Sequence, residues 1–93
     1  MSIYQQIATK IIKEQQLIIG PLALSESKKV NGLTVVNSKP IEVQIEGNEQ
    51  EVINRLVAQY ERLFGRASHE VCREAVSRII ADINPEEVPT SLR

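Results

Sequence analysis

Two residues in the second half of the chain carry side chains that could ligate a metal or perform nucleophilic catalysis. His69 and Cys72 are three positions apart in a segment of helical periodicity, so their side chains lie on the same side of that helix. Imidazole and thiolate are both zinc ligands, and a two-fold axis would bring two such pairs together. A thiol enzyme uses the same couple, but it also needs an exposed thiol and a third group that orients the base.

The sequence lacks the further residues that a zinc site or a thiol enzyme would need. No CxxC and no second histidine accompany the pair, and Cys72 falls at the centre of an apolar stripe, where cysteine acts as a small hydrophobe. A glycine-rich phosphate loop and a pair of spaced carboxylates are also missing from the sequence. We therefore predict no enzyme activity, no catalytic residues, no metal site and no cofactor. A metal-dependent dimer through His69 and Cys72 is the least favoured alternative.

Arginines are the second group of residues whose side chains could support a function. Four of them follow one another on the polar side of two predicted helices: Arg55, Arg62, Arg66 and Arg73. Guanidinium groups pair well with phosphate, so a nucleic-acid-binding accessory protein is the alternative function. Against it, the net charge is −1. In addition, Glu51, Glu70 and Glu74 each precede an arginine by three or four positions, which allows ordinary ion pairs along a helix.

These residues belong to two matched amphipathic segments that are joined at a glycine. Apolar residues in 48–64 and in 68–83 recur three and four positions apart, the spacing of one face of an α-helix. Gly65 lies between the segments, where the end of a helix calls for a positive φ. Two helices joined so closely must pack against each other or against a common surface.

The first half of the chain predicts a further helix and a β-hairpin. Residues 2–19 form an amphipathic helix, and 21–29 form a short second helix or a kinked continuation after Gly20-Pro21. Residues 33–36 are rich in β-branched side chains, and 41–46 alternate between apolar and polar. A four-residue turn between these segments predicts an antiparallel hairpin.

The element order α-α-β-β-α-α predicts an α+β fold, with helices packed on one face of a two-stranded antiparallel hairpin. We assign residues 1–84 to a single domain and residues 85–93, which contain two prolines, to a flexible tail. A single cysteine favours a reducing compartment, and the sequence shows no signal peptide and no apolar run of about 20 residues. The prediction is a cytoplasmic protein without a membrane segment.

A two-stranded sheet is marginal in water and leaves its outer edges unpaired. We therefore predict a homodimer, in which the hairpins join into a four-stranded sheet or the first helices pack together. The first-helix interface would consist of Ile7, Ile11, Gln15 and Ile18. There Gln15 would either fix the register of the two helices or lie at the margin with its amide in solvent. The predicted function is a small non-enzymatic homodimeric interaction or regulatory module, with its process and any other protein partner left open.

Overall fold

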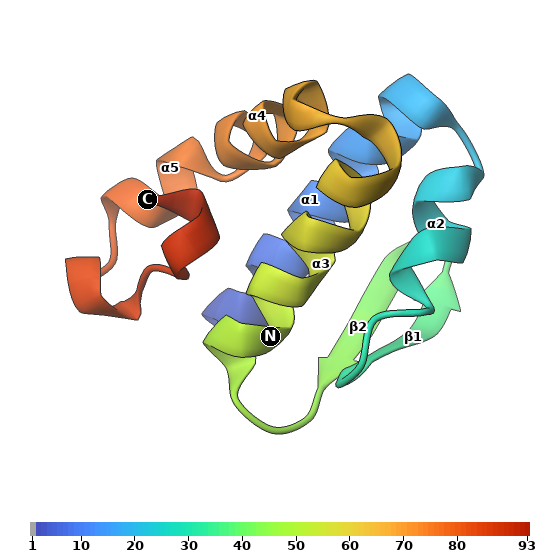
Figure 1. The fold of residues 1–93 in the computed structure, drawn as a ribbon. Helices are drawn as coiled ribbons and strands as arrows, with labels where there is room; N and C mark the ends of the chain where they lie inside the picture. Colours follow the sequence, from blue (N-terminus) through green and yellow to red (C-terminus); the bar gives the residue numbers. More distant parts are fainter. Residues whose placement is uncertain (1) are drawn as a thin grey trace.

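The computed structural model describes residues 2–93, and its elements follow the predicted order as far as the fourth helix (Figure 1). The elements are α1 (Ile3–Ile19), α2 (Leu22–Ser27), β1 (Leu33–Ser38), β2 (Ile41–Ile45), α3 (Glu49–Phe64), α4 (Arg66–Ala75) and α5 (Ser77–Ala81), followed by single 3₁₀ turns at Pro85–Glu87 and Thr90–Leu92. The two strands form an antiparallel sheet, and the helices pack against it. The predicted α+β fold is confirmed.

Helix α1 begins and ends where the sequence predicts. The Ser2 hydroxyl accepts a hydrogen bond from the backbone N–H of Gln5, and the Gln5 side chain accepts one from the Ser2 N–H. This reciprocal cap satisfies two backbone donors that the first turn would otherwise leave unpaired. The helix ends at Gly20, whose φ of +68° turns the chain into Pro21 and α2.

The hairpin has a tighter turn than the sequence suggests. Leu33 pairs with Ile45, a register shift follows Val35, and Ser38 then pairs with Ile41, so only two residues form the turn. Along β2 the buried and exposed positions alternate as predicted, and the inner face packs on α1. Each strand is paired with the other alone among residues 2–93. A four-stranded sheet across a dimer therefore stays a prediction.

The core lies between α1, α3, α4 and the inner face of the hairpin. Its largest fully buried side chains are Tyr60, Ile7, Ile11, Ile12, Ile53 and Leu56. Figure 1 shows α1 and α3 side by side, with α2 packed against both of them near one end of the hairpin. The Tyr60 hydroxyl donates a 2.6 Å hydrogen bond to the Ala23 carbonyl and joins α3 to α2. Burial raises the pKa of Tyr60, so this hydroxyl keeps its proton. No helix within residues 2–93 has the length and apolar character to cross a bilayer.

The predicted single helix over 68–83 is wrong, because the chain leaves helical geometry at Val76. That residue has φ −111° and ψ 8°, and its side chain is fully buried. The Ser77 hydroxyl donates to the Glu74 carbonyl at 3.1 Å and so pairs an acceptor at the end of α4. The break lets α5 change direction while Val76 stays in the core. Gly65, at the other end of α4, has φ +89° as expected.

Residues 85–93 are packed against α3, which corrects the expectation of a flexible tail. Val88, Pro89 and Leu92 are buried, and Asn54 of α3 hydrogen-bonds both Thr90 and Ser91. The apolar side chains of Val88 and Leu92, four positions apart, anchor the segment to the core although it contains two prolines.

Candidate functional site

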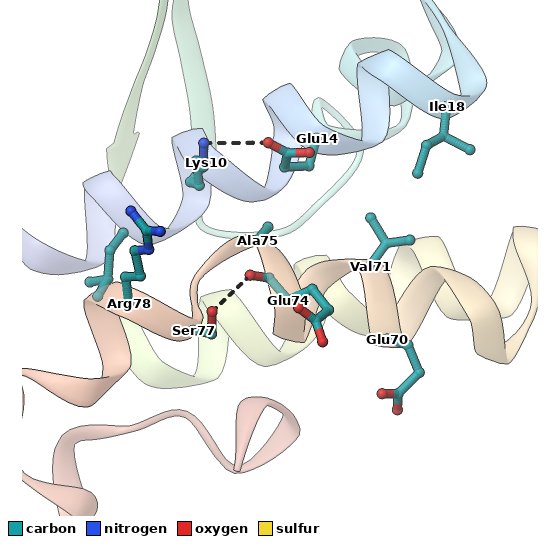
Figure 2. Close-up of a pocket in the computed structure, with 10 residues that line it drawn as sticks. Lys10, Glu14, Ile18, Glu70, Val71, Glu74, Ala75, Ser77 and Arg78 are labelled. Carbon is teal, nitrogen blue, oxygen red and sulfur yellow. Dashed lines mark hydrogen bonds and ion pairs between the residues drawn. The ribbon is translucent and has the colours of Figure 1, made fainter.

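A groove of about 590 Å³ lies between α1 and the α4–α5 pair (Figure 2). Its lining residues are Lys10, Glu14 and Ile18 from α1, Glu70, Val71, Glu74 and Ala75 from α4, and Ser77, Arg78 and Ile79 from α5. The apolar members come from all three helices, and charged side chains surround them. We refer to this feature as the α1–α4/α5 groove.

The charged side chains of the groove differ in whether they have a partner. Lys10 and Glu14 form an ion pair of 3.3 Å along α1, and Glu70 is paired with an arginine of α4. Glu74 and Arg78 have no ion pair and no side-chain hydrogen bond with any residue in 2–93. Figure 2 shows Arg78 extending towards α1, while Glu74 points away from it. The groove therefore presents one anion and one cation that are both unpaired within residues 2–93.

The sequence predicts an i,i+4 ion pair between Glu74 and Arg78, and the helix break explains why it is not made. An uninterrupted helix would place the two side chains one turn apart on one face. The chain departs from the helix at Val76, between them, so α5 carries Arg78 in another direction.

Exposed apolar side chains lie at the end of α1 and at the start of α2, and one of them also lines the groove. Ile18, which lines the groove, is 62% exposed, and its neighbour Leu17 is 80% exposed. Leu22 at the start of α2 is 52% exposed. Scattered apolar residues are normal on protein surfaces, whereas neighbouring ones beside a groove are typical of contact surfaces. We call Leu17, Ile18 and Leu22 the α1-end patch.

The predicted first-helix interface falls into two environments. Ile7, Ile11 and Gln15 are fully buried inside a single copy of the chain, and only Ile18 is exposed. Helices α3 and α4 and the hairpin already cover the face of α1 on which the three buried residues lie. An interface through those three side chains is therefore not available, and a second copy would contact α1 at Ile18 and the adjoining patch.

Gln15 joins α1 to α4 rather than reaching solvent. Its amide Nε2 donates to the Ser68 carbonyl at 3.0 Å and to the Cys72 sulfur at 3.4 Å. Its Oε1 is buried and has no hydrogen-bond partner. The predicted margin position with a solvated amide is wrong. A buried acceptor left unpaired costs about 1–3 kcal/mol, which makes this position a source of strain in the core.

His69 and Cys72 lie in different surroundings, one hydrogen-bonded to neighbouring elements and the other buried in the core. Burial raises the pKa of the Cys72 thiol to about 11, an effect that the hydrogen bond from Gln15 only partly offsets. The ring of His69 has other neighbours: Nδ1 lies 3.0 Å from Glu61 Oε1, and Nε2 contacts the Ser91 carbonyl oxygen. Within residues 2–93, no cluster of three or more histidine, cysteine or acidic side chains has the arrangement of a metal site.

The structure brings together two of the four predicted arginines. Arg55 and Arg62 line a hollow of about 340 Å³ beside Lys29, which the sequence gave no reason to group with them. Both guanidinium groups are already engaged, Arg55 with the Asn31 carbonyl at 3.2 Å and Arg62 with a glutamine of its own helix.

The other arginines of the predicted set lie apart from this hollow. Arg73 lines a separate hollow next to Leu92 and is paired with Glu70 at 3.3 Å. Arg66 is exposed at the start of α4 and lines neither hollow. Lys29 forms an ion pair with Glu26, whose pKa is lowered by hydrogen bonds from Lys29 and Gln59. The four arginines thus form no continuous surface.

Comparison with protein-family models, curated proteins and solved structures finds no match for this chain. Its function is therefore argued from its own geometry. Among the features above, the α1–α4/α5 groove combines exposed apolar side chains with charges that have no partner in the part of the chain that the structure describes. Such a combination is typical of a surface that contacts another protein.

Proposed function

We propose that this chain is a small non-enzymatic interaction module that works in the cytoplasm as a homodimer, joined through the α1–α4/α5 groove. The proposal depends chiefly on one observation, the unpaired anion Glu74 and the unpaired cation Arg78 in the same apolar groove. In a two-fold interface, each residue meets the same surface on the other copy. A groove that carries one unpaired charge of each sign is therefore complementary to itself in these two charges.

The geometry of such a dimer follows from where these charges lie. If the two-fold axis passes between α4 and α5, Glu74 of each copy faces Arg78 of the other, and two ion pairs form. The apolar floor supplies the remaining contact, from Ile18 of α1, Val71 of α4 and Ile79 of α5. A standard interface covers about 800 Å² on each copy, or about 15% of the 5410 Å² that a single chain exposes.

A non-enzymatic role is supported by the state of the nucleophile and the base that the sequence offers. The thiol of Cys72 is buried and keeps its proton, and a thiol is a far weaker nucleophile than a thiolate. Both ring nitrogens of His69 face oxygen atoms of the chain itself. A protein-binding role needs neither group.

A charge-reversal cycle tests the proposed interface. Glu74→Arg and Arg78→Glu each place like charges opposite one another, and each is expected to weaken the dimer about tenfold. The double variant restores both pairs with their signs exchanged and should return the affinity to near the wild-type value. Sedimentation velocity over a range of protein concentrations measures the four dissociation constants, those of the wild type, the two single variants and the double variant.

Two matched controls separate the groove from general effects of charge or polarity. Arg66→Glu changes the same charge as Arg78→Glu at an exposed position outside the groove. Leu63→Asp, at a residue 46% exposed on α3, is the counterpart of Ile18→Asp in the groove. Both controls should leave the dimer intact. A dimer that both single reversals leave unchanged would refute this interface.

Nucleic-acid binding is kept as a second candidate because Lys29, Arg55 and Arg62 line one hollow. Such binding would weaken steeply with salt and would be reduced by Arg62→Glu. A gel-shift titration at low and moderate salt tests it with single- and double-stranded DNA and RNA. If the mobility of every probe is unchanged at low salt, this candidate is eliminated.

A further inference from the structure

After α5 the chain turns back, and residues 85–93 return to the helices, where side chains from three of them bind the segment (Figure 1). From α1, the Tyr4 hydroxyl donates to the Glu87 carbonyl at 2.8 Å. From α3, the Gln50 amide donates to the Glu86 carbonyl at 3.2 Å. From α4, His69 Nε2 donates to the Ser91 carbonyl.

Asn54 of α3 makes the densest set of contacts with the segment. Its Oδ1 accepts hydrogen bonds from the Ser91 backbone N–H at 3.0 Å and from the Ser91 hydroxyl at 2.6 Å. Its Nδ2 donates to the Thr90 hydroxyl at 3.0 Å. One amide thus pairs a backbone donor and two hydroxyls. Together with the three carbonyl contacts, most of these bonds go to main-chain groups of the segment.

When proteins bind peptide segments, main-chain hydrogen bonds contribute affinity and spaced apolar anchors contribute specificity. The anchors here are Val88 and Leu92, each 4% exposed. The bonds to main-chain groups hold the segment in place, whereas the anchors select its sequence. The face that binds residues 85–93 therefore has the parts of a peptide-binding site.

The residues that make this face are held by contacts that do not involve the segment. The helix that carries Asn54 packs on α1 and α4 through its own buried residues, among them Ile53 and Leu56. His69 is fixed by Glu61 as well as by the segment. On the α5 side, an open surface hollow of about 780 Å³ borders the segment, so this side of it faces solvent.

We propose that this face is a peptide-binding site that holds residues 85–93 of its own chain and accepts the same segment from a second copy. We choose a second copy as the source of the peptide because residues 85–93 are the segment that fits this face, and every copy of the chain carries them. Exchange of an identical element between copies also needs no new contacts, which makes it a low-cost route to association. The inference is independent of the α1–α4/α5 groove, since the hydrogen bonds that carry it involve none of the groove residues.

The test uses the full chain with its own segment displaced by Leu92→Glu, which puts a charge at a buried anchor. A fluorescently labelled peptide with the sequence of residues 84–93 is titrated into this variant, and anisotropy reports binding. We expect saturable binding to the variant. The wild-type chain, whose own segment competes for the site, should need at least about tenfold more protein for the same signal.

Three comparisons make the result specific. Adding Asn54→Ala to the variant removes three hydrogen bonds and should weaken peptide binding about tenfold or more. A peptide that itself carries Leu92→Glu should not bind. Ile18→Asp should disrupt the groove dimer but leave the affinity for the peptide unchanged. This variant therefore separates the two proposals.

Two results would overturn the proposal. One is a folded Leu92→Glu chain that does not bind the peptide, or that binds a scrambled peptide equally well. The other is loss of the helical circular dichroism signal in Leu92→Glu, because it would show that the segment is part of the core and that no preformed site exists. As a second route, Asn54→Ala alone, in the wild-type chain, should loosen the segment to proteases while the helical signal is kept.

Discussion

Replacing Gln15 by leucine is expected to stabilise the chain by about 1 kcal/mol, although the substitution removes a buried hydrogen bond. The wild-type amide donates to the Ser68 carbonyl at 3.0 Å, while its own Oε1 is buried without a partner. Leucine has a similar volume and no polar atom, so it fills the same space among Ile11, Ile12 and Cys72.

The magnitude follows from two opposing terms. Losing the amide–carbonyl hydrogen bond costs about 1 kcal/mol, and the Ser68 carbonyl keeps the regular hydrogen bond of its helix. Removing the unpaired Oε1 regains about 1–3 kcal/mol of desolvation penalty. The net gain of about 1 kcal/mol corresponds to a rise in melting temperature of about 4–8 °C for a domain of this size.

Urea unfolding followed by circular dichroism measures this difference. Gln15→Ala is the matched control, because it removes the same polar atoms but leaves a cavity, and it should destabilise by about 2 kcal/mol or more. If Gln15→Leu lowered the free energy of unfolding by 1 kcal/mol or more, the amide bridge would be a net source of stability. The assignment of Oε1 as an unsatisfied acceptor would then be refuted.

Three further predictions follow from other parts of the fold. The first concerns Cys72, whose folded-state pKa of about 11 lies above the ordinary 9.0: the protonated thiol contributes fully below pH 9, and up to about 3 kcal/mol is lost as pH rises through 11. Unfolding free energies from pH 8 to 10 should show this slope, and Cys72→Ala should flatten it; an unchanged slope in the variant would contradict the assignment. Above pH 10 the raised pKa of Tyr60 adds a slope of the same sign. The second concerns Gly32, where an added Cβ would lie 2.6 Å from Val52 Cγ2 and 2.9 Å from the Glu46 carbonyl at φ +88°. Gly32→Ala should therefore cost about 3 kcal/mol or more, whereas Gly47→Ala, at φ +86° with open space around it, should cost about 1–2 kcal/mol. Equal losses by thermal unfolding would show that the close approach is not real. The third concerns Asn54→Ala, which should lower the free energy of unfolding by about 1–3 kcal/mol, against about 0.5–1 kcal/mol for Gln50→Ala with its single hydrogen bond. A larger effect at Gln50 would contradict the contacts described for the segment.

Local patterns predicted the elements that depend on local forces. The strict alternation in 41–46 indicated which side chains of β2 face inward, and the helical spacing of apolar residues in 2–19 and 48–64 indicated α1 and α3. Gly65 was found because few other residues adopt a positive φ without strain. Each of these signals operates within a few residues of the chain.

Tertiary contacts decided what the sequence could not. Helical periodicity continues through Val76, yet the core takes up that side chain at the cost of a straight helix. Two prolines suggested a loose end at 85–93, but the partner that fixes Ser91 is Asn54, which is 37 residues away. Gln15 was placed on the correct helix, but its burial depends on how α4 crosses α1.

The candidate site was foreseen only in part for the same reason. Ile18 was named among the interface residues, and it is the member of that set that remains exposed. The groove itself arises from the break between α4 and α5, which separates Arg78 from Glu74. No periodicity in the sequence indicates that break.

The mass of the chain in solution is the most direct test of the central claim that the groove joins two copies. Sedimentation equilibrium of the wild-type chain over a range of micromolar concentrations should give a mass approaching twice 10.4 kDa, and Ile18→Asp should return it to a single copy. A mass of 10.4 kDa at every concentration, or a dimer that Ile18→Asp and both charge reversals leave intact, would contradict it.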